Sequence, residues 1–227
     1  MLRGMNLIGG GATVSVEGSY TFNSQAGLVQ VPHTVMTTAS LSMGVAAADR
    51  KIVVVCNGVI SNSGVTLSTL TIGGVSLAHD VSVGTTALTS LRTEIWSKDI
   101  ASGTTGVVVA TWSGNTNQSQ CFVYSLYGFA TGDAATSDTG TDPASDSDVL
   151  SLDIDVAAKG FVLASMVRAD TVDREWTNVV EDDYQQPSDG HAVASKIYST
   201  AQNALTITGE SSQAANAAMA AAAWPLA

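Results

Sequence analysis

The sequence predicts an all-β fold, an antiparallel β-sandwich of jelly-roll-like type with two weakly similar halves. Three observations support this fold class. Runs rich in Val, Ile, Thr and aromatic residues recur along the chain, with Gly, Ser and Asn between them. Before the C-terminal run, no window keeps the helical apolar period over three turns. Segments of the second half resemble segments of the first half in the same order.

The predicted strands follow one another along most of the chain. The clearest hairpin is "STLTIGGVSL", in which Gly73 and Gly74 can adopt the positive φ that a tight primed turn requires. Alternation of apolar and polar residues on both sides of these glycines is typical of half-buried strands. The predicted strands are residues 12–17, 28–38, 40–47, 51–60, 67–72, 75–83, 88–98, 105–112, 120–129, 149–156, 160–168, 175–180, 192–199 and 204–209.

The C-terminal run "AAMAAAAW" is ambiguous, because alanine is the best helix former. An internal comparison favours a strand. "KIVVVCNGVIS" (51–61) resembles "KGFVLASMVRA" (159–169), and "CFVYSLYGF" (121–129) aligns with "AMAAAAWPL" (218–226). The alanines therefore stand where the first half has a strand. We predict a strand here, with small side chains that let two sheets, or a neighbouring chain, approach closely.

The predicted organisation is one sandwich preceded by an N-terminal segment. That segment is Gly-rich, nearly uncharged and β-prone, which suits addition of a strand to a neighbouring protein. An acidic stretch joins the two halves. The boundaries are 1–33 for the arm or docking strand, 34–227 for the sandwich, about 34–131 and 149–227 for its halves, and 132–148 for the acidic connector.

Charge is distributed unevenly along the chain. Residues 1–132 hold five acidic and five basic residues, whereas residues 133–227 hold fifteen acidic and four basic ones, which is the whole net charge of −11. This sign repels phosphate backbones, so we expect no nucleic-acid partner. The longest apolar run is shorter than the ~18–20 residues of a membrane-spanning helix, so we expect no membrane partner. The start "MLRGMNLIGGG" has too short an apolar run for a secretory signal.

No catalytic motif is recognisable, and we expect no enzymatic activity. The chain has no G-x-S-x-G nucleophile elbow, and "IGGGATVS" does not follow a strand as a phosphate loop would. His33, His79 and His191 are isolated, and the cysteine spacing matches no zinc motif. Cys56 and Cys121 lie in strand-like runs, so we expect buried free thiols.

The acidic connector "GDAATSDTGTDPASDSD" is the first candidate binding site. Its aspartates are interspersed with Ala, Ser, Thr and Gly, without the spacing of a calcium-binding loop. We therefore expect a solvated connection and no cofactor. The alternative is a calcium site, with Asp142, Asp146 and Asp148 as its ligands.

A second acidic cluster is "ADTVDREWTNVVEDDY" (169–184), which surrounds Trp176. An exposed tryptophan among carboxylates could stack on a sugar or anchor a protein interface, with Asp182, Asp183 and Tyr184 beside it. The alternative is a core tryptophan on a strand whose outer face is charged. The sequence leaves both interpretations open.

Between about residues 50 and 130 the chain reads "KIVVVCNGVISNSGVTLSTLTIGGVSL", "TEIWSKDIASGTTGVVVATWSG" and "CFVYSLYGFATGD". This succession of strands and hairpins resembles a β-sandwich module of tailed-phage virion proteins, which also occurs in some bacterial surface proteins. The second half continues the resemblance more faintly, to the terminal "AAWPLA". These motifs are patterns of strands and turns, so the resemblance transfers no functional residue.

The resemblance implies a non-enzymatic structural protein of a bacteriophage particle. A capsid decoration or head-fibre protein is expected first, and a tail or collar component next. Lack of a recognisable secretory signal favours a virion protein assembled in the bacterial cytoplasm over a bacterial surface protein. The expected partners are major capsid or tail proteins, and identical chains in a homo-oligomer. The alternative is a carbohydrate- or receptor-binding module, assisted by calcium, with Trp176 and Tyr184 in its site.

Overall fold

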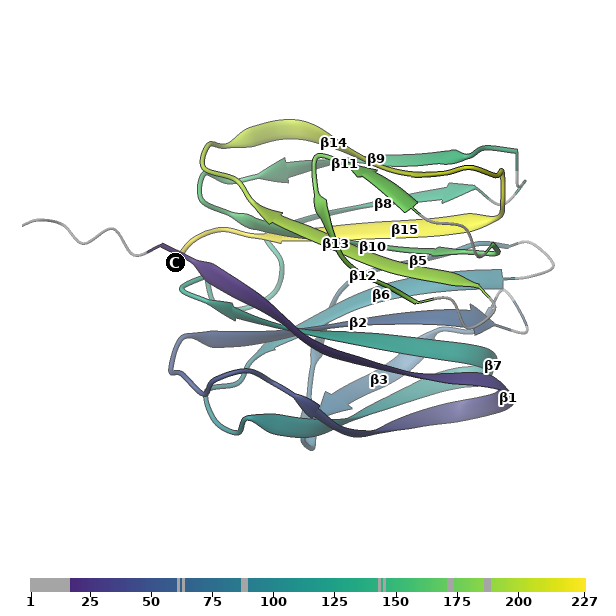
Figure 1. The fold of residues 1–227 in the computed structure, drawn as a ribbon. Coiled ribbons are helices and arrows are strands. Elements are labelled where there is room, and N and C mark those ends of the chain that lie inside the picture. The colour runs from purple at the N-terminus through teal and green to yellow at the C-terminus, as the bar shows by residue number, and fades with distance from the viewer. Residues whose placement is uncertain are drawn as a thin grey trace, which may run out of the picture.

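The computed structural model of the protein describes residues 17–60, 62, 64–86, 90–142, 144, 146–170, 174–185 and 189–227. All secondary-structure elements in these ranges are β-strands, and the strands pair in the antiparallel direction. This confirms the predicted all-β, antiparallel fold class. The same residues contain no helix long and apolar enough to cross a membrane. The strands (Figure 1) are β1 (Ser19–Ser42), β2 (Arg50–Ile60), β3 (Leu67–Ile72), β4 (Val75–Ser76), β5 (Ala78–Gly84), β6 (Ser90–Asp99), β7 (Thr105–Tyr127), β8 (Thr136–Asp142), β9 (Val149–Val156), β10 (Phe161–Arg168), β11 (Arg174–Thr177), β12 (Val180–Gln185), β13 (Gly190–Ile197), β14 (Gln202–Ser211) and β15 (Ala217–Trp224).

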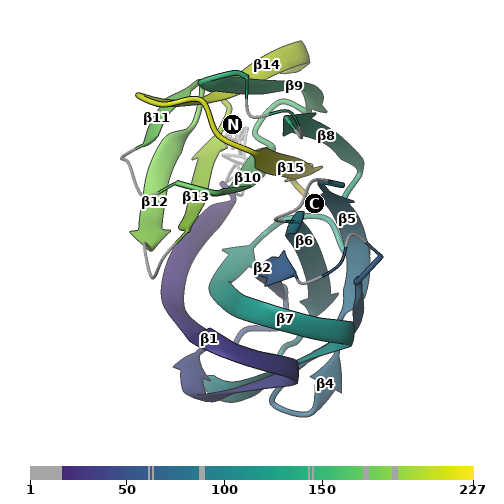
Figure 2. The ribbon, with the colours of Figure 1, turned by 90° about the vertical axis from the view of Figure 1, so that its right-hand side faces the viewer.

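The first half is a seven-stranded sheet that folds over on itself. Its strand order is β4-β3-β7-β2-β6-β5, and β1 pairs along β7. Strands β1 and β7 hold 24 and 23 residues, and both curve strongly (Figure 2). The register of β1 on β7 shifts at several points, including between Thr37 and Ser40, and such bulges let a long strand bend. The folded sheet encloses a core that contains Met36, Leu70 and Trp112.

The second half uses two separate sheets. One has five strands in the order β12-β13-β10-β15-β8, and the other has three in the order β11-β14-β9. Alternate residues of β9 are buried, as the sequence pattern of that strand predicts. The two sheets enclose a core that contains Ile154, Met166 and Ile207.

The strand order of the second half repeats that of the first. Strand β2 lies between β6 and β7, and β10 lies between β13 and β15 in the same way. Strand β5 borders β6 as β12 borders β13. Strand β7 pairs with both β1 and β3, as β14 pairs with both β9 and β11. The internal repeat inferred from the sequence is therefore present in the strand pairing, while the jelly-roll connectivity stays a prediction.

A third core lies between the two halves, so the sheet layers form one continuous stack (Figure 1). It joins Val55 of β2 and Phe122 of β7 to Leu163 of β10 and Ala222 of β15. Every residue of β2, β10 and β15 is buried, because one face of each strand meets the core of its own half and the other face meets the third core. Burial on both faces removes the polar alternation that marks half-exposed strands.

The alanine run forms strand β15, which confirms the strand prediction. Its two neighbours are β10 and β8. Met219 and Ala221 face the core of the second half, whereas Ala220 and Ala222 face the third core. Packing on both faces overrides the helix propensity of alanine, and methyl side chains let the sheets approach closely.

The connector is more ordered than the sequence analysis expected. Seven of its residues, Thr136–Asp142, form β8, an edge strand paired with β15. The expectation of a solvated connection without a strand was therefore wrong for these residues, although alternate side chains of β8 are exposed. Their small polar side chains gave a weak strand signal, and the strand forms because an edge position needs only one hydrogen-bonding partner. Gly140 fits here because a Cβ atom would lie 2.6 Å from the carbonyl oxygen of Ser151.

The predicted docking arm also differs from the structure. From Ser19 onward the segment belongs to β1 and pairs with β7 of its own chain, beginning with Ser19 opposite Tyr127. Intramolecular pairing already uses this strand, so residues 19–33 are part of the first half and not a free arm. The remainder of the predicted arm, residues 1–16, lies outside the described residues.

Two buried arginines fasten loops to the central strands. Arg50, the first residue of β2, donates hydrogen bonds to the carbonyl oxygens of Ile100 at 2.8 Å and Ser102 at 2.7 Å. Arg168, the last residue of β10, donates to the carbonyl oxygen of Gln213 at 2.8 Å. Both side chains are fully buried. Carbonyl acceptors offset the cost of removing each cation from water.

Removal of β15 should unfold the protein. A chain that ends at Gln213 lacks the strand between β10 and β8 and exposes two cores. We expect loss of the β-sheet signal in far-UV circular dichroism and of the cooperative thermal transition. A chain that ends at Pro225 retains β15 and should remain folded. A stable, cooperatively melting chain ending at Gln213 would contradict the structural role of β15.

A larger side chain in the third core should also destabilise the fold. Ala220→Leu inserts three carbon atoms between closely packed sheets and should lower the free energy of unfolding by about 1–3 kcal/mol. Ala39→Leu is the matched control, because Ala39 lies on β1 and is exposed. Urea denaturation of both variants measures the difference. Equal stabilities would show that the sheets are not closely packed at Ala220.

Candidate functional site

The proposed calcium ligands do not converge. Asp142 is buried, and its carboxylate accepts hydrogen bonds from the backbone nitrogens of Ala144 at 3.2 Å and Ser147 at 3.0 Å. Asp146 and Asp148 are exposed. Among the described residues, no three His, Cys, Asp or Glu side chains are grouped so that they could hold a metal ion. Asp142 therefore caps the turn that follows β8.

Trp176 packs at the edge of the second core. It lies on β11 opposite Gly209 of β14, and its half-buried ring packs against the core of the second half. Its indole nitrogen donates a hydrogen bond to Glu181 at 3.2 Å. Of the two alternatives for Trp176, this arrangement agrees with a tryptophan that packs against the core. The missing side chain at Gly209 leaves room for Met166, whose Cε and Sδ atoms would lie 2.6 and 2.9 Å from a Cβ atom there.

The other residues of the predicted cluster are divided between the two faces of β12. Asp183 pairs with Val193, which belongs to the third core, whereas Tyr184 pairs with Ala192, the neighbour of Val193 on the opposite face of β13. The irregularity between Glu181 and Asp183 inserts Asp182 into this strand. The cluster therefore does not form one binding surface.

Asp182 is bound to the first half of the molecule. The hydroxyl of Tyr124 on β7 donates a hydrogen bond to its carboxylate at 2.9 Å. Partial burial raises the pKa of Asp182, and burial raises the pKa of Tyr124 well above its usual value. Tyr184 lies instead under the guanidinium of Arg174, whose Cζ is 5.1 Å from the ring centre. Each of these two side chains is therefore held by a contact within the protein.

Sequence reasoning missed a buried polar cluster near these residues. Asp170 forms ion pairs with Arg168 and Arg174, and all three side chains are nearly or fully buried. His191 of β13 is fully buried beside them, and its Nε2 lies 3.4 Å from the side-chain oxygen of Gln118 on β7. The cluster therefore connects the halves. The alternation of Arg168, Asp170 and Arg174 in the sequence was the one available signal for it.

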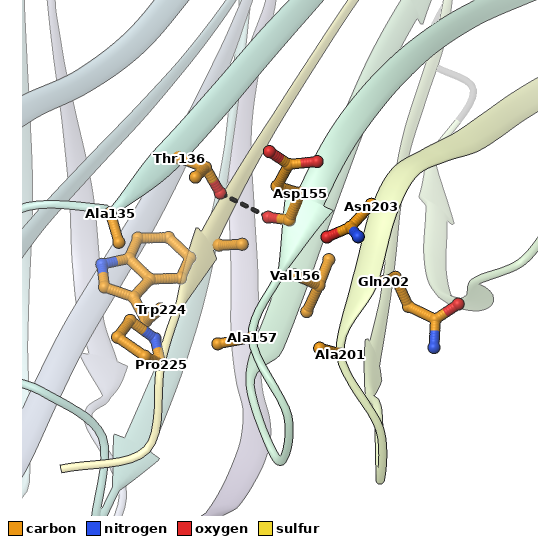
Figure 3. A pocket seen from close by; sticks show the side chains of 11 residues that line it. Ala135, Thr136, Asp155, Val156, Ala157, Ala201, Gln202, Asn203, Trp224 and Pro225 are labelled. Carbon is orange, nitrogen blue, oxygen red and sulfur yellow. Dashed lines mark hydrogen bonds between the residues drawn. The ribbon is translucent and has the colours of Figure 1, made fainter.

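A pocket of about 240 Å³ opens where the two sheets of the second half separate (Figure 3). Trp224 and Val156 line it on opposite sides. Two polar side chains around it already form hydrogen bonds within the protein. Asp155 accepts a hydrogen bond from the backbone nitrogen of Ala204 at 2.7 Å, and the amide of Gln202 donates to the carbonyl oxygen of Thr200 at 3.0 Å. The indole nitrogen of Trp224 lies on the side away from Gln202 (Figure 3). The described polar side chains that line this pocket do not converge on one point.

The outermost layer of the first half presents an uncharged surface. Outward side chains of β3, β7 and β1 form two rows across the sheet, while the residues between them point into the core. The stretches 18–48, 64–77 and 100–131 contain no Asp, Glu, Lys or Arg. We call the two rows the uncharged outer face, and its members are Thr69, Thr111 and Val35 in one row and Thr71, Val109 and Thr37 in the next.

The equivalent layer of the second half is acidic. Asp153 and Asp155 on β9, Glu175 on β11 and Glu210 on β14 are all exposed, and we call them the acidic outer face. The only basic residue in these three strands, Arg174, is buried. Part of the uneven charge of the sequence is therefore an asymmetry between two equivalent layers at opposite ends of the stack (Figure 1).

Stability should fall in mild acid because of His191. Burial, and secondarily the charge of Arg174, lower its pKa from 6.5 to about 3. Between these values the unfolded chain binds a proton that the folded chain does not. The His191 contribution is therefore fully present above pH 6.5 and decreases by about 1.4 kcal/mol per pH unit as the pH falls toward 3.

The pH dependence can be measured by urea denaturation between pH 7.5 and 4. His191→Gln keeps a polar side chain and removes the titrating group, so its stability should depend less on pH than that of the unmodified protein. Identical slopes for the two proteins would show that His191 does not titrate in this way.

Comparison with known proteins places the chain in no family. No family model matches it, and no curated protein matches it either. Function is therefore inferred from the strand and turn patterns of the sequence and from the two outer faces.

Proposed function

We propose that this protein is a non-enzymatic structural component of a bacteriophage particle that docks through its uncharged outer face. A capsid decoration or head-fibre position is the first choice, and a tail or collar position is the second. The observation that carries the proposal is the contrast between the outer faces: equivalent strands are free of charge at one end and acidic at the other.

The cost of desolvation determines which face docks. Burial of an unpaired carboxylate costs several kcal/mol, whereas Thr and Val side chains lose little when they leave water. Val35 is 46% exposed and Val107 is 36% exposed, so apolar surface remains available on the uncharged side. The acidic outer face then points into solvent, where its charge keeps particles apart.

The expected partners are a major capsid or tail protein and further copies of the same chain, arranged with closed symmetry. The acidic surface makes a nucleic-acid partner unfavourable. The alternative of a carbohydrate- or receptor-binding module required Trp176, Asp182, Asp183 and Tyr184 to form one site. Because these residues lie on different faces of the second half, we retain the structural role.

A positive charge on the uncharged outer face should weaken attachment. Val35→Lys places an unpaired ammonium group in the proposed contact and should reduce the copy number on particles at least about tenfold. Ser151→Lys is the matched control, since Ser151 is exposed on β9 and the same charge is added to the acidic end. Quantitative mass spectrometry of purified particles gives the copy number. Equal attachment of both variants would contradict docking through this face.

Attachment should also resist salt. An uncharged contact has little electrostatic attraction for ions to screen, so protein bound to particles should remain bound between about 0.1 and 0.5 M NaCl. Release in this range, measured by sedimentation of the particles, would indicate instead that the acidic outer face binds a basic partner.

A further inference from the structure

The two cysteines of the chain lie side by side in the core of the first half. Cys56 of β2 is the direct cross-strand partner of Cys121 of β7, and their sulfur atoms are 3.0 Å apart. Both residues are completely buried and carry free thiols. They lie 65 positions apart in the sequence, so only the fold brings them together.

The backbone already has the spacing of a disulfide. Directly opposed residues in an antiparallel pair have Cα atoms about 4.5–5.5 Å apart, and disulfides connect Cα atoms at about 4.4–6.8 Å. The sulfur atoms need to approach by about 1 Å to reach the length of an S–S bond. Rotation of the two side chains can supply this distance, so the strands need not move apart or slide.

We propose that Cys56 and Cys121 form a latent disulfide, held as a dithiol after folding under reducing conditions and closed by a small peroxide. One sulfur attacks an oxygen of hydrogen peroxide, which breaks the O–O bond, releases water and leaves a sulfenic acid. The sulfur of the other cysteine then attacks the sulfenic sulfur, and a second water leaves with its thiol proton. Two thiols and one peroxide thus give one disulfide and two waters, with two electrons passing to the peroxide.

Burial determines which oxidant can act. It raises the pKa of the Cys56 thiol well above its usual value, and the contact with Cys121 raises it further. The reactive thiolate is therefore scarce, and a bulky disulfide reagent cannot reach it. A peroxide is close to water in size and can enter during small openings of the sheet. The proposal is independent of the proposed virion role.

The crosslink should stabilise the folded chain. It closes a long loop between β2 and β7 and thereby restricts the unfolded state. For a protein of this length, the midpoint of thermal unfolding should rise by about 5–10 °C.

The test uses the full-length reduced protein, treated with hydrogen peroxide, then denatured and alkylated. We expect the intact mass to fall by two hydrogens, with no alkyl group added, and the thermal midpoint to rise. Without peroxide, both cysteines should be alkylated after denaturation. A bulky aromatic disulfide reagent should leave the folded protein unmodified. Cys121→Ala and Cys56→Ala serve as controls, and neither should show the thermal shift.

Three outcomes would overturn the proposal. Peroxide could leave both thiols free, or oxidise one of them to a sulfinic or sulfonic acid, which adds oxygen instead of removing hydrogen. The disulfide could also join two chains, which appears as a dimer on a non-reducing gel. The mass measurement on the unmodified sequence decides among these outcomes even if an alanine variant fails to fold.

Discussion

The fold depends on the close packing of two sheet layers, one from each half, across the third core. Strand β15 makes this packing possible, because its alanines present only methyl groups to the first half while Met219 fills the second core. Larger side chains in place of Ala220 and Ala222 would push the layers apart around Val55 and Phe122. The two halves therefore share a buried surface that neither could leave exposed to water.

This shared core restricts where polar groups can lie. The central strands β2, β10 and β15 are buried on both faces, and their charged residues, Arg50, Lys51 and Arg168, all lie at strand ends. Three polar side chains that enter between the halves are hydrogen-bonded to one another: the hydroxyl of Ser165 donates to Asn57 at 3.0 Å, and the hydroxyl of Thr93 donates to Ser165 at 2.9 Å. The buried guanidinium of Arg50 is also hydrogen-bonded, in its case to backbone carbonyl oxygens. Such directional bonds fix the register between the halves, which apolar contact alone leaves free.

Sequence analysis predicted the fold class and the strand nature of the alanine run, because the repeat supplied information that propensity lacked. It missed β8, whose Thr, Ser and Gly residues carry no apolar signal and gain strand geometry only from pairing with β15. It also treated residues 19–33 as an arm, because pairing over the whole length of β7 is non-local. The cluster around Trp176 is divided between two faces for a related reason. Closeness in sequence did not determine which face of β12 each residue occupies, since the insertion of Asp182 shifts that alternation.

The repeat also allows the two outer faces to be compared without a second protein. Equivalent strands have the same pairing, so backbone geometry cannot account for any difference between the ends of the stack. At the acidic end, Glu175 lies directly opposite Glu210, a cross-strand pair of like charges that weakens the sheet. Water and salt relieve this repulsion only while the face stays exposed, and covering it with an apolar partner would increase it. The uncharged end has no such penalty. Contact with another protein therefore costs less free energy at the uncharged outer face than at the acidic outer face.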